Sequence, residues 1–144
     1  MSTKSTDILV SNVMLSLDSF PIVIHNEMMR ETLVSMNNYK LGIACIVDSN
    51  KRLLAVITDG DIRRILLTSQ KTLPSLFVED VLDYSSKDFK FVGPDMSLEK
   101  AIDIMGKNKL WDLPVVDSLG NLLGLLHLHP AIKKVIDLGK LTKK

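Results

Sequence analysis

In one stretch near the middle of the chain, the hydrophobic pattern changes from that of a strand to that of a helix. Leu53–Ile57 is a short, continuous apolar run, which is typical of a buried β-strand. Apolar residues then recur at helical spacing, at Ile62, Ile65 and Leu66. The residues of Thr58–Asp61 fill the turn between them. The pattern predicts a strand, a tight turn and a helix.

The rest of the pattern predicts short strands and helices joined by polar turns. A helix is expected over Glu27–Asn37, because Met29, Leu33 and Met36 fall on one face. Ile43–Val47 is typical of a buried strand that forms a hairpin with the strand after it. The other expected elements are one or two helical turns at Ile8–Met14, an extended run at Pro21–Ile24, a helix from Asp61 to Thr68 and a linker at Ser69–Ser75.

The order of elements repeats along the chain. Aligning Asp48 with Asp117 defines a shift of 117 − 48 = 69 residues. This shift places apolar residues on apolar residues, as in the pairs Ile22 and Phe91, Met29 and Leu98, Leu33 and Ile102, Met36 and Met105, Leu53 and Leu122, and Ile57 and Leu126. We therefore predict an α/β (α+β) fold of tandem β-α-β-β-α repeats, at residues 8–69 and 76–138. Neither half can close a core alone, so the two are expected to pack about a pseudo-twofold axis.

The turn before the first repeat's last helix carries polar groups at the spacing of a capping box. Thr58 can accept a hydrogen bond from the amide three residues on, while Asp61 reaches back to the Thr58 amide. Helix capping alone would account for both residues, since one cap contributes roughly 1 kcal/mol. The same geometry also suits a phosphorylated ribose, because helix amides, Arg63 and Arg64 favour phosphate and a carboxylate accepts from ribose hydroxyls. Gly60, in the same turn, is a further candidate binding residue. A divalent metal on Asp59 and Asp61 would lack a third carboxylate nearby.

Composition and charge exclude several classes of function. The chain has 144 residues, 46% of them apolar, which is enough to bury a core. Its formal net charge of +1 argues against binding of DNA or RNA. Cys45, its one cysteine, lies in an apolar run, so we expect a buried thiol and a reducing, cytoplasmic setting. The N-terminal MSTKSTD is polar and no apolar run reaches the roughly 18 residues of a membrane span, so a soluble protein is expected.

These motifs resemble the CBS domain, named for cystathionine β-synthase, whose units occur in tandem pairs. The first repeat contains the strand-to-helix phrase AVITDGDIRR, and the second contains SLEKAIDIMGKNKLWDLPVVDSLGNLLGLL. The resemblance implies one CBS pair over residues 1–144, with a nucleotide in the cleft between its units. It implies that Asp61 binds ribose hydroxyls and that Thr58 contacts ribose or phosphate. The base would be held around Ile43, Ala44 and Cys45.

The second repeat departs from this signature. His127 stands at the position of Thr58, and Pro130 stands at the position of Asp61. Proline suits the first turn of a helix, so this half needs no ligand to explain it. His127 and His129 have no third metal ligand close in sequence. Trp111 lies where the family holds its base, so it either stacks on a ligand ring or packs in a core or dimer contact.

The amino-acid sequences of the two repeats look most like those of the CBS pairs of arabinose 5-phosphate isomerases and sugar nucleotidyltransferases. We therefore expect a non-catalytic sensor that binds AMP, ADP, ATP or a CMP-sugar and modulates a sugar-phosphate or nucleotidyltransferase enzyme. An enzyme is disfavoured, because no nucleophile with a base and no Gly-rich phosphate loop is visible. The alternative is a dimerisation module with a vestigial nucleotide cleft. A homodimer is expected through two apolar helix faces, Ile62, Ile65 and Leu66 in one repeat and Ile132, Val135 and Ile136 in the other.

Overall fold

The computed structural model describes residues 8–142, which form two compact units. We call residues 17–89 and 119–122 the first unit, and residues 8–16, 90–118 and 123–142 the second unit. The predicted pair at 1–144 also includes residues 1–7 and 143–144, which lie outside the described residues. Within residues 8–142 the chain forms five α-helices and two small sheets, as the mixed α/β prediction requires. No helix in this range is both long and apolar enough to cross a membrane.

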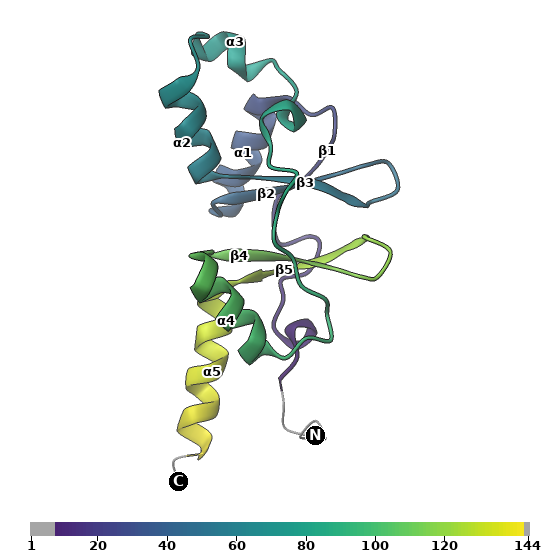
Figure 1. The fold of residues 1–144 in the computed structure, drawn as a ribbon, viewed down its shortest axis with the longest axis vertical. Helices are drawn as coiled ribbons and strands as arrows, with labels where there is room; N and C mark the ends of the chain where they lie inside the picture. Colours follow the sequence, from purple (N-terminus) through teal and green to yellow (C-terminus); the bar gives the residue numbers. More distant parts are fainter. Residues whose placement is uncertain (1–7, 143–144) are drawn as a thin grey trace. The chain divides into compact units, whose positions relative to one another are not determined.

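The first unit is built on a three-stranded sheet (Figure 1). Its central strand β2 is buried at all five positions because every residue in it is apolar. The strand β1 pairs with β2 in parallel, and β3 pairs with it antiparallel, as the predicted hairpin requires. The elements in chain order are β1 (Ile22–Ile24), α1 (Met29–Tyr39), β2 (Ile43–Val47), β3 (Leu53–Thr58), α2 (Asp59–Thr68), α3 (Leu73–Phe77) and the 3₁₀ helix η2 (Val81–Tyr84).

The second unit has the same plan with a smaller sheet (Figure 1). Strands β4 and β5 form a hairpin, and Val92 joins it only through one parallel bridge to Val115. This bridge stands where β1 pairs with β2 in the first unit. The elements in chain order are the 3₁₀ helix η1 (Val10–Asn12), α4 (Leu98–Asn108), β4 (Asp112–Val116), β5 (Leu122–His127) and α5 (Leu128–Thr142).

The predicted repeat is confirmed at a shift of 69 residues. Helices α1 and α4, strands β2 and β4, and strands β3 and β5 have bounds that differ by that number at both ends. The helix ends match as well, because Lys40 and Lys109 both take the left-handed conformation, with φ of 57° and 56°. An equivalent backbone hydrogen bond joins the ends of each hairpin. It runs from the Asp59 amide to Gly42 O at 3.0 Å in the first unit and from the Leu128 amide to Trp111 O at 2.8 Å in the second.

Some predicted elements have different bounds in the structure. The helix expected over Glu27–Asn37 spans Met29–Tyr39. The helix expected to begin at Asp61 begins at Asp59, because Thr58 is its N-cap and Asp61 is already its third residue. The expected linker Ser69–Ser75 leads into α3 and contributes its first residues. Thr72 caps α3 by accepting from the Ser75 amide at 3.4 Å, and Pro74 is tolerated because it lies in the first turn.

Each unit is completed by a segment that precedes the other repeat in the chain. The segment 8–16 packs on the second unit, where Val10 N donates to Met96 O at 2.9 Å and Leu15 pairs with Leu125. The segment 78–89 packs on the first unit through equivalent bonds, with Val81 N donating to Glu27 O at 2.8 Å. The compact units therefore differ from the predicted continuous repeats 8–69 and 76–138, because residues 8–16 bond with the second repeat.

These exchanged segments place apolar side chains in both cores. Val81 is fully buried in the first unit and Val10 is fully buried in the second. One cluster of buried side chains in the first unit consists of Val23, Met29, Met36, Ala44, Ile46, Ala55, Ile57 and Val81. One such cluster in the second unit consists of Val10, Val92, Leu98, Ala101, Met105, Leu113, Val115, Leu126 and Ala131. Each segment thus contributes to the burial that stabilises the unit it joins.

A polar cluster ties the loop before α3 to the segment after it. Lys71 Nζ lies 2.6 Å from Glu79 Oε1, and it also contacts the Tyr84 hydroxyl at 3.1 Å. The Tyr84 hydroxyl donates to Glu79 Oε2 at 2.6 Å. The hydrogen bond to Glu79, followed by that to Tyr84, raises the pKa of Lys71. The hydrogen bond from Lys71, followed by that from Tyr84, lowers the pKa of Glu79 from its usual value of 4.5.

The shifted pKa of Glu79 predicts an acid-dependent contribution to stability. A carboxylate whose pKa is lowered by folding stabilises the folded state above its unfolded pKa, and the effect is lost as pH falls through the folded pKa. Glu79→Gln should therefore melt slightly below the wild type at neutral pH, with the difference closing as the pH falls. Thermal melts of both proteins across the acid range check this, and a difference that stays constant would contradict it. The effect should be small, because the cluster is exposed.

Candidate functional site

The strand-to-helix junction of the first unit forms the predicted capping box. The Asp61 amide donates to Thr58 Oγ1 at 3.2 Å, and the Thr58 amide donates to Asp61 Oδ2 at 2.9 Å. The Thr58 hydroxyl also donates to Asp61 Oδ2, at 3.1 Å. These reciprocal bonds hold the Asp61 carboxylate at the start of α2, where the helix dipole favours negative charge.

Arg64 covers the other oxygen of the same carboxylate. Its Nη2 donates to Asp61 Oδ1 across one turn of α2. The Arg64 side chain is 63% exposed, whereas that of Asp61 is 17% exposed. An exposed ion pair of this spacing contributes only about 0.3–0.5 kcal/mol, so Arg64 can leave the carboxylate at little cost. Arg63, the neighbouring candidate, is exposed.

The Asp61 carboxylate keeps capacity to accept further hydrogen bonds. A carboxylate offers about four acceptor positions. Two donors from Thr58 use Oδ2, and Arg64 uses one position on Oδ1. One position on Oδ1 remains, and a second becomes available when Arg64 moves away. Two adjacent hydroxyl groups could therefore bind Oδ1 without breaking the cap.

Gly60 leaves space beside these groups. A side-chain Cβ at this position would meet the Arg64 guanidinium at 3.5 Å and Thr58 Oγ1 at 3.6 Å, which are ordinary contact distances. The backbone of α2 therefore does not require glycine at Gly60. Its absent side chain keeps the approach to Thr58 and Asp61 open.

The residues expected around a base lie at the start of the central strand β2, next to this junction. Ile43 is directly opposite Thr58 in the β2–β3 register, with Ala44 and Cys45 following along β2. All three are buried, so their side chains belong to the core and only backbone groups near the strand start are candidates for binding. The Cys45 amide donates to Pro21 O at 3.0 Å, which directs the Cys45 backbone toward β1. Because strand groups alternate, the Ile43 backbone has the same direction, toward Pro21.

Pro21 is a site feature that the sequence reasoning did not identify. In a regular parallel ladder, a residue here would donate its amide to the Ile43 carbonyl. Proline has no N–H, so Pro21 cannot supply that bond. The signal was present in the sequence as a proline immediately before β1. Its meaning depends on the register between β1 and β2.

The equivalent junction in the second unit has different chemistry. His127 Nδ1 lies 2.7 Å from Asp112 Oδ1, and the Asp112 side chain is only 8% exposed. Under the 69-residue shift, Asp112 and His127 occupy the positions of Ile43 and Thr58. An acid–imidazole pair thus replaces the apolar residue and the hydroxyl of the first unit. Asp112 was not among the predicted residues, although the shift alone would have placed it beside His127.

Trp111 and Pro130 are two further differences between the junctions of the two units. Trp111 is 72% exposed, so within this chain it does not lie in the core, and a contact with a ligand ring or a dimer partner stays a prediction. Pro130 lies in the first turn of α5, as expected, and supplies no carboxylate there. Of the predicted site residues, Trp111 and His127 belong to the second unit, and all the others belong to the first. Across residues 8–142, no three His, Cys, Asp or Glu side chains gather in a way that could hold a metal ion.

The chain matches the CBS domain twice, at residues 10–68 and 78–129. It therefore belongs to the CBS-domain family, and its two repeats form a tandem CBS pair. The matches cover both hairpins and both strand-to-helix junctions described above.

Known relatives carry similar sequences or folds. Arabinose 5-phosphate isomerase KdsD of Francisella tularensis is 26% identical over 128 residues, covering 86% of this chain and 36% of the isomerase. The chain spans about a third of the length of the first curated relatives it matches, 35% in each. Among solved structures, CBSX2 in complex with AMP has a TM-score of 0.80 at 22% identity, covering 92% of this chain and 98% of CBSX2. The CBS pair of MJ0100, in complex with 5′-methylthioadenosine and S-adenosyl-L-methionine, has a TM-score of 0.74 at 20% identity, covering 93% and 98%.

Proposed function

We propose that this CBS pair is a non-catalytic regulatory module that binds an adenine nucleotide or a related adenosine derivative at the first unit's β3–α2 junction. The observation that carries this proposal is the Asp61 carboxylate, held by Thr58 with acceptor positions left on Oδ1. The two adjacent hydroxyls of a ribose match these positions. Hydrogen bonds to a charged group contribute roughly 1.5–3 kcal/mol, which makes Asp61 the main determinant of ribose binding.

The neighbouring groups suit the other two parts of a nucleotide. The Ile43 carbonyl faces Pro21, which cannot donate to it, so it can accept from the exocyclic amino group of adenine. The positive end of the α2 dipole and the exposed Arg63 favour phosphate, and Arg64 joins them once ribose displaces it from Asp61. AMP, ADP, ATP and adenosine derivatives all offer ribose, and a CMP-sugar does so with a different base. The ligands named for CBSX2 and MJ0100 share the adenosine group, which supports the adenine choice.

We further propose that ligand occupancy modulates a partner enzyme of sugar-phosphate or sugar-nucleotide metabolism in the cytoplasm. The similarity to arabinose 5-phosphate isomerase KdsD supports this class of partner. In that relative the matching region makes up about a third of the protein, so most of its length lies outside the part similar to this chain. The buried free thiol of Cys45 suits a reducing compartment.

One AMP molecule per chain is the expected stoichiometry. Only the first unit offers a hydroxyl and a carboxylate at the junction, and the second offers the Asp112–His127 pair and Pro130 instead. Isothermal titration calorimetry with AMP should give one site per chain. Two equivalent sites would mean that His127 can replace Thr58 and Asp61, and an absence of heat at millimolar AMP would reject the adenine-nucleotide proposal.

The second candidate function is an interaction module with a vestigial ligand site. The capping box favours it, because Thr58 and Asp61 already bond with each other and with Arg64 in the absence of a ligand. Exposed apolar side chains on α2 also favour an interaction module. Leu66 is 56% exposed and Leu67 is 78% exposed. Of the other residues of the predicted dimer face, Ile62 and Ile65 pack on the first unit's core.

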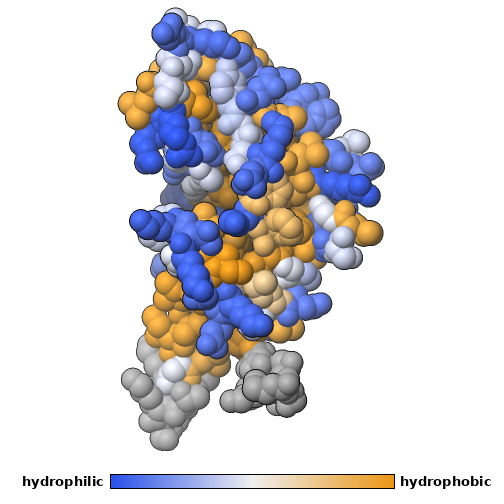
Figure 2. Space-filling model, in the orientation of Figure 1, coloured by the Kyte–Doolittle hydropathy of each residue, from blue (hydrophilic) through white to orange (hydrophobic). Residues whose placement is uncertain are grey.

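A homodimer through exposed helix faces is compatible with both candidate functions. On α5, Ile132, Val135 and Ile136 are 42%, 47% and 51% exposed, and apolar side chains gather on this part of the second unit (Figure 2). Analytical ultracentrifugation at micromolar concentration should show a dimer. The variant Ile136→Asp should shift it toward monomer, because a carboxylate would be buried in an apolar interface. A wild-type monomer would reject the dimer.

A further inference from the structure

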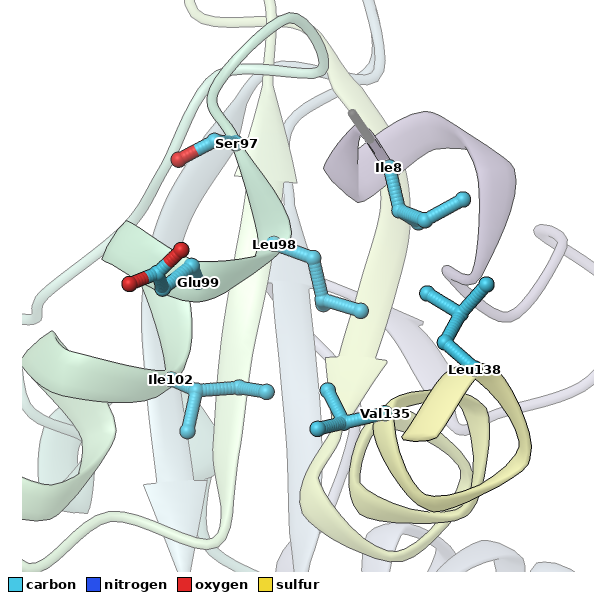
Figure 3. Close-up of a pocket in the computed structure, with 7 residues that line it drawn as sticks. All are labelled: Ile8, Ser97, Leu98, Glu99, Ile102, Val135 and Leu138. Atoms are coloured by element: carbon cyan, nitrogen blue, oxygen red, sulfur yellow. The ribbon is translucent and has the colours of Figure 1, made fainter. Parts of the chain in front are cut away.

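A groove in the second unit is lined mainly by apolar side chains from three segments. It has a volume of about 510 Å³ and is lined by Ile8, Ser97, Leu98, Glu99, Ile102, Val135 and Leu138. Figure 3 shows that the apolar side chains of α4, α5 and the exchanged segment face a common space. The Ser97 hydroxyl and the Glu99 carboxylate lie at one side of it (Figure 3). The groove is far from the Thr58–Asp61 junction in sequence and belongs to the other unit.

The first unit fills the equivalent place with one of its own helices. There the exchanged segment enters at Glu79, whose carbonyl accepts from the Met29 amide at 2.9 Å, just as the Ile8 carbonyl accepts from the Leu98 amide at 2.8 Å. The helix α3 directly precedes Glu79 and packs on α1. Its residue Leu76 is only 4% exposed. In the first unit, therefore, a short helix that carries a buried leucine packs on α1.

The sequence before the other exchanged segment cannot supply such a leucine. The two exchanged segments align with a shift of 79 − 8 = 71 residues, which places Leu76 on Ser5 and α3 on residues 2–6. Those residues read STKST and include no apolar side chain. Burial of a leucine side chain stabilises such a contact, and serine cannot replace it.

We propose that this groove, between α4, α5 and residue Ile8, is a docking site for a short helix of a partner protein. The repeat defines the chemistry of that helix, because the first unit binds Leu73–Phe77 at the matching place. It should present a leucine to Leu98, Ile102 and Val135, in the manner of an amphipathic helix in an apolar groove. Glu99 is exposed at the side of the groove and favours a lysine or arginine next to that leucine. The site is independent of nucleotide binding.

The test uses the chain's own α3 sequence as the probe. A synthetic peptide of residues 71–79, KTLPSLFVE, is titrated to millimolar concentration into the isotope-labelled full chain and followed by NMR. We expect saturable shifts concentrated at residues 97–102 and 135–138. Val135→Asp should weaken binding about tenfold or more, because it puts a carboxylate into the groove. A peptide with Leu76→Ser should bind correspondingly weakly, and Glu99→Lys should weaken binding several-fold.

Ile136→Asp is the matched control, because Ile136 is exposed on the same helix but does not line the groove. It should bind the peptide as the wild type does, even where it disrupts a homodimer. Asp61→Asn should also bind the peptide normally, which separates this site from the nucleotide site. The proposal is overturned if the peptide causes no localised shifts, or if Val135→Asp leaves its affinity unchanged. It is also overturned if only self-association responds to Val135→Asp, since the groove would then be part of the homodimer.

Discussion

Replacing Asp61 by asparagine should weaken AMP binding about tenfold to a hundredfold while the melting temperature of the free protein hardly changes. Asparagine keeps one acceptor oxygen for the Thr58 amide, so the cap loses only a fraction of its roughly 1 kcal/mol. The ion pair with Arg64 is exposed on one side and contributes little. A bound ribose, by contrast, loses a charged acceptor for both hydroxyls.

Asp59→Asn is the matched control for this change. Asp59 lies in the first turn of the same helix and is exposed, and the box is made by Thr58 and Asp61. Removing its charge should leave AMP affinity within a few-fold of the wild type. Calorimetry and thermal melts of the two variants separate the interpretations. If Asp61→Asn melts several degrees lower and still binds AMP with wild-type affinity, Asp61 is only a cap and the ribose proposal fails.

A methyl group at Gly124 should destabilise the protein by about 1–3 kcal/mol, because it overpacks a closed contact. A Cβ at this position in β5 would lie 2.7 Å from Leu15 O and 2.7 Å from Met14 Sδ. The Met14 side chain can move, but the Leu15 carbonyl is fixed by its bond from the Leu125 amide at 3.2 Å, and the Leu15 amide donates to Leu125 O at 2.7 Å. Gly124→Ala should therefore displace the exchanged segment 8–16 from the second unit. The melting temperature should fall by several degrees.

Gly106→Ala, in the same unit, should raise the stability of the protein where Gly124→Ala lowers it. Gly106 lies inside α4, and a Cβ there would meet nothing within 4 Å. Alanine is favoured over glycine in a helix by about 0.8–1.0 kcal/mol, so this variant should be more stable than the wild type. Hydrogen exchange can then test the mechanism, because Gly124→Ala should lose protection at the Leu15 and Leu125 amides first. Equal stability of Gly124→Ala and the wild type would contradict the close packing of the segment.

Local elements were predictable because short-range physics determines them. The strand Ile43–Val47 was placed with its exact bounds, since an all-apolar run of this length between polar turns has few other stable states. The capping box was predicted from Thr58 and Asp61 because its bonds span only three residues. The 69-residue repeat was also readable, because both halves need the same apolar positions to bury equivalent faces.

Only the tertiary structure decided which unit each exchanged segment packs on. Val10 and Val81 each reach a core in the repeat that does not follow them directly, and a pattern of apolar residues carries no information about which core they enter. The cover of α1 by α3 likewise depends on Leu76 reaching a helix far from it in sequence. Such pairings are set by which edge groups and apolar faces remain open once the sheets have formed.

The sequence by itself thus determined the elements, the repeat and the polar groups at the first junction. The tertiary structure decided which of those groups meet their neighbours. Asp112 and His127 are 15 residues apart and become partners only because the β4–β5 hairpin places them side by side. Pro21 lies opposite the Ile43 carbonyl, to which it cannot donate, only because of the register of β1 against β2. Long-range register, unlike a cap or a hairpin, depends on the burial of the whole sheet and therefore appears only in the folded chain.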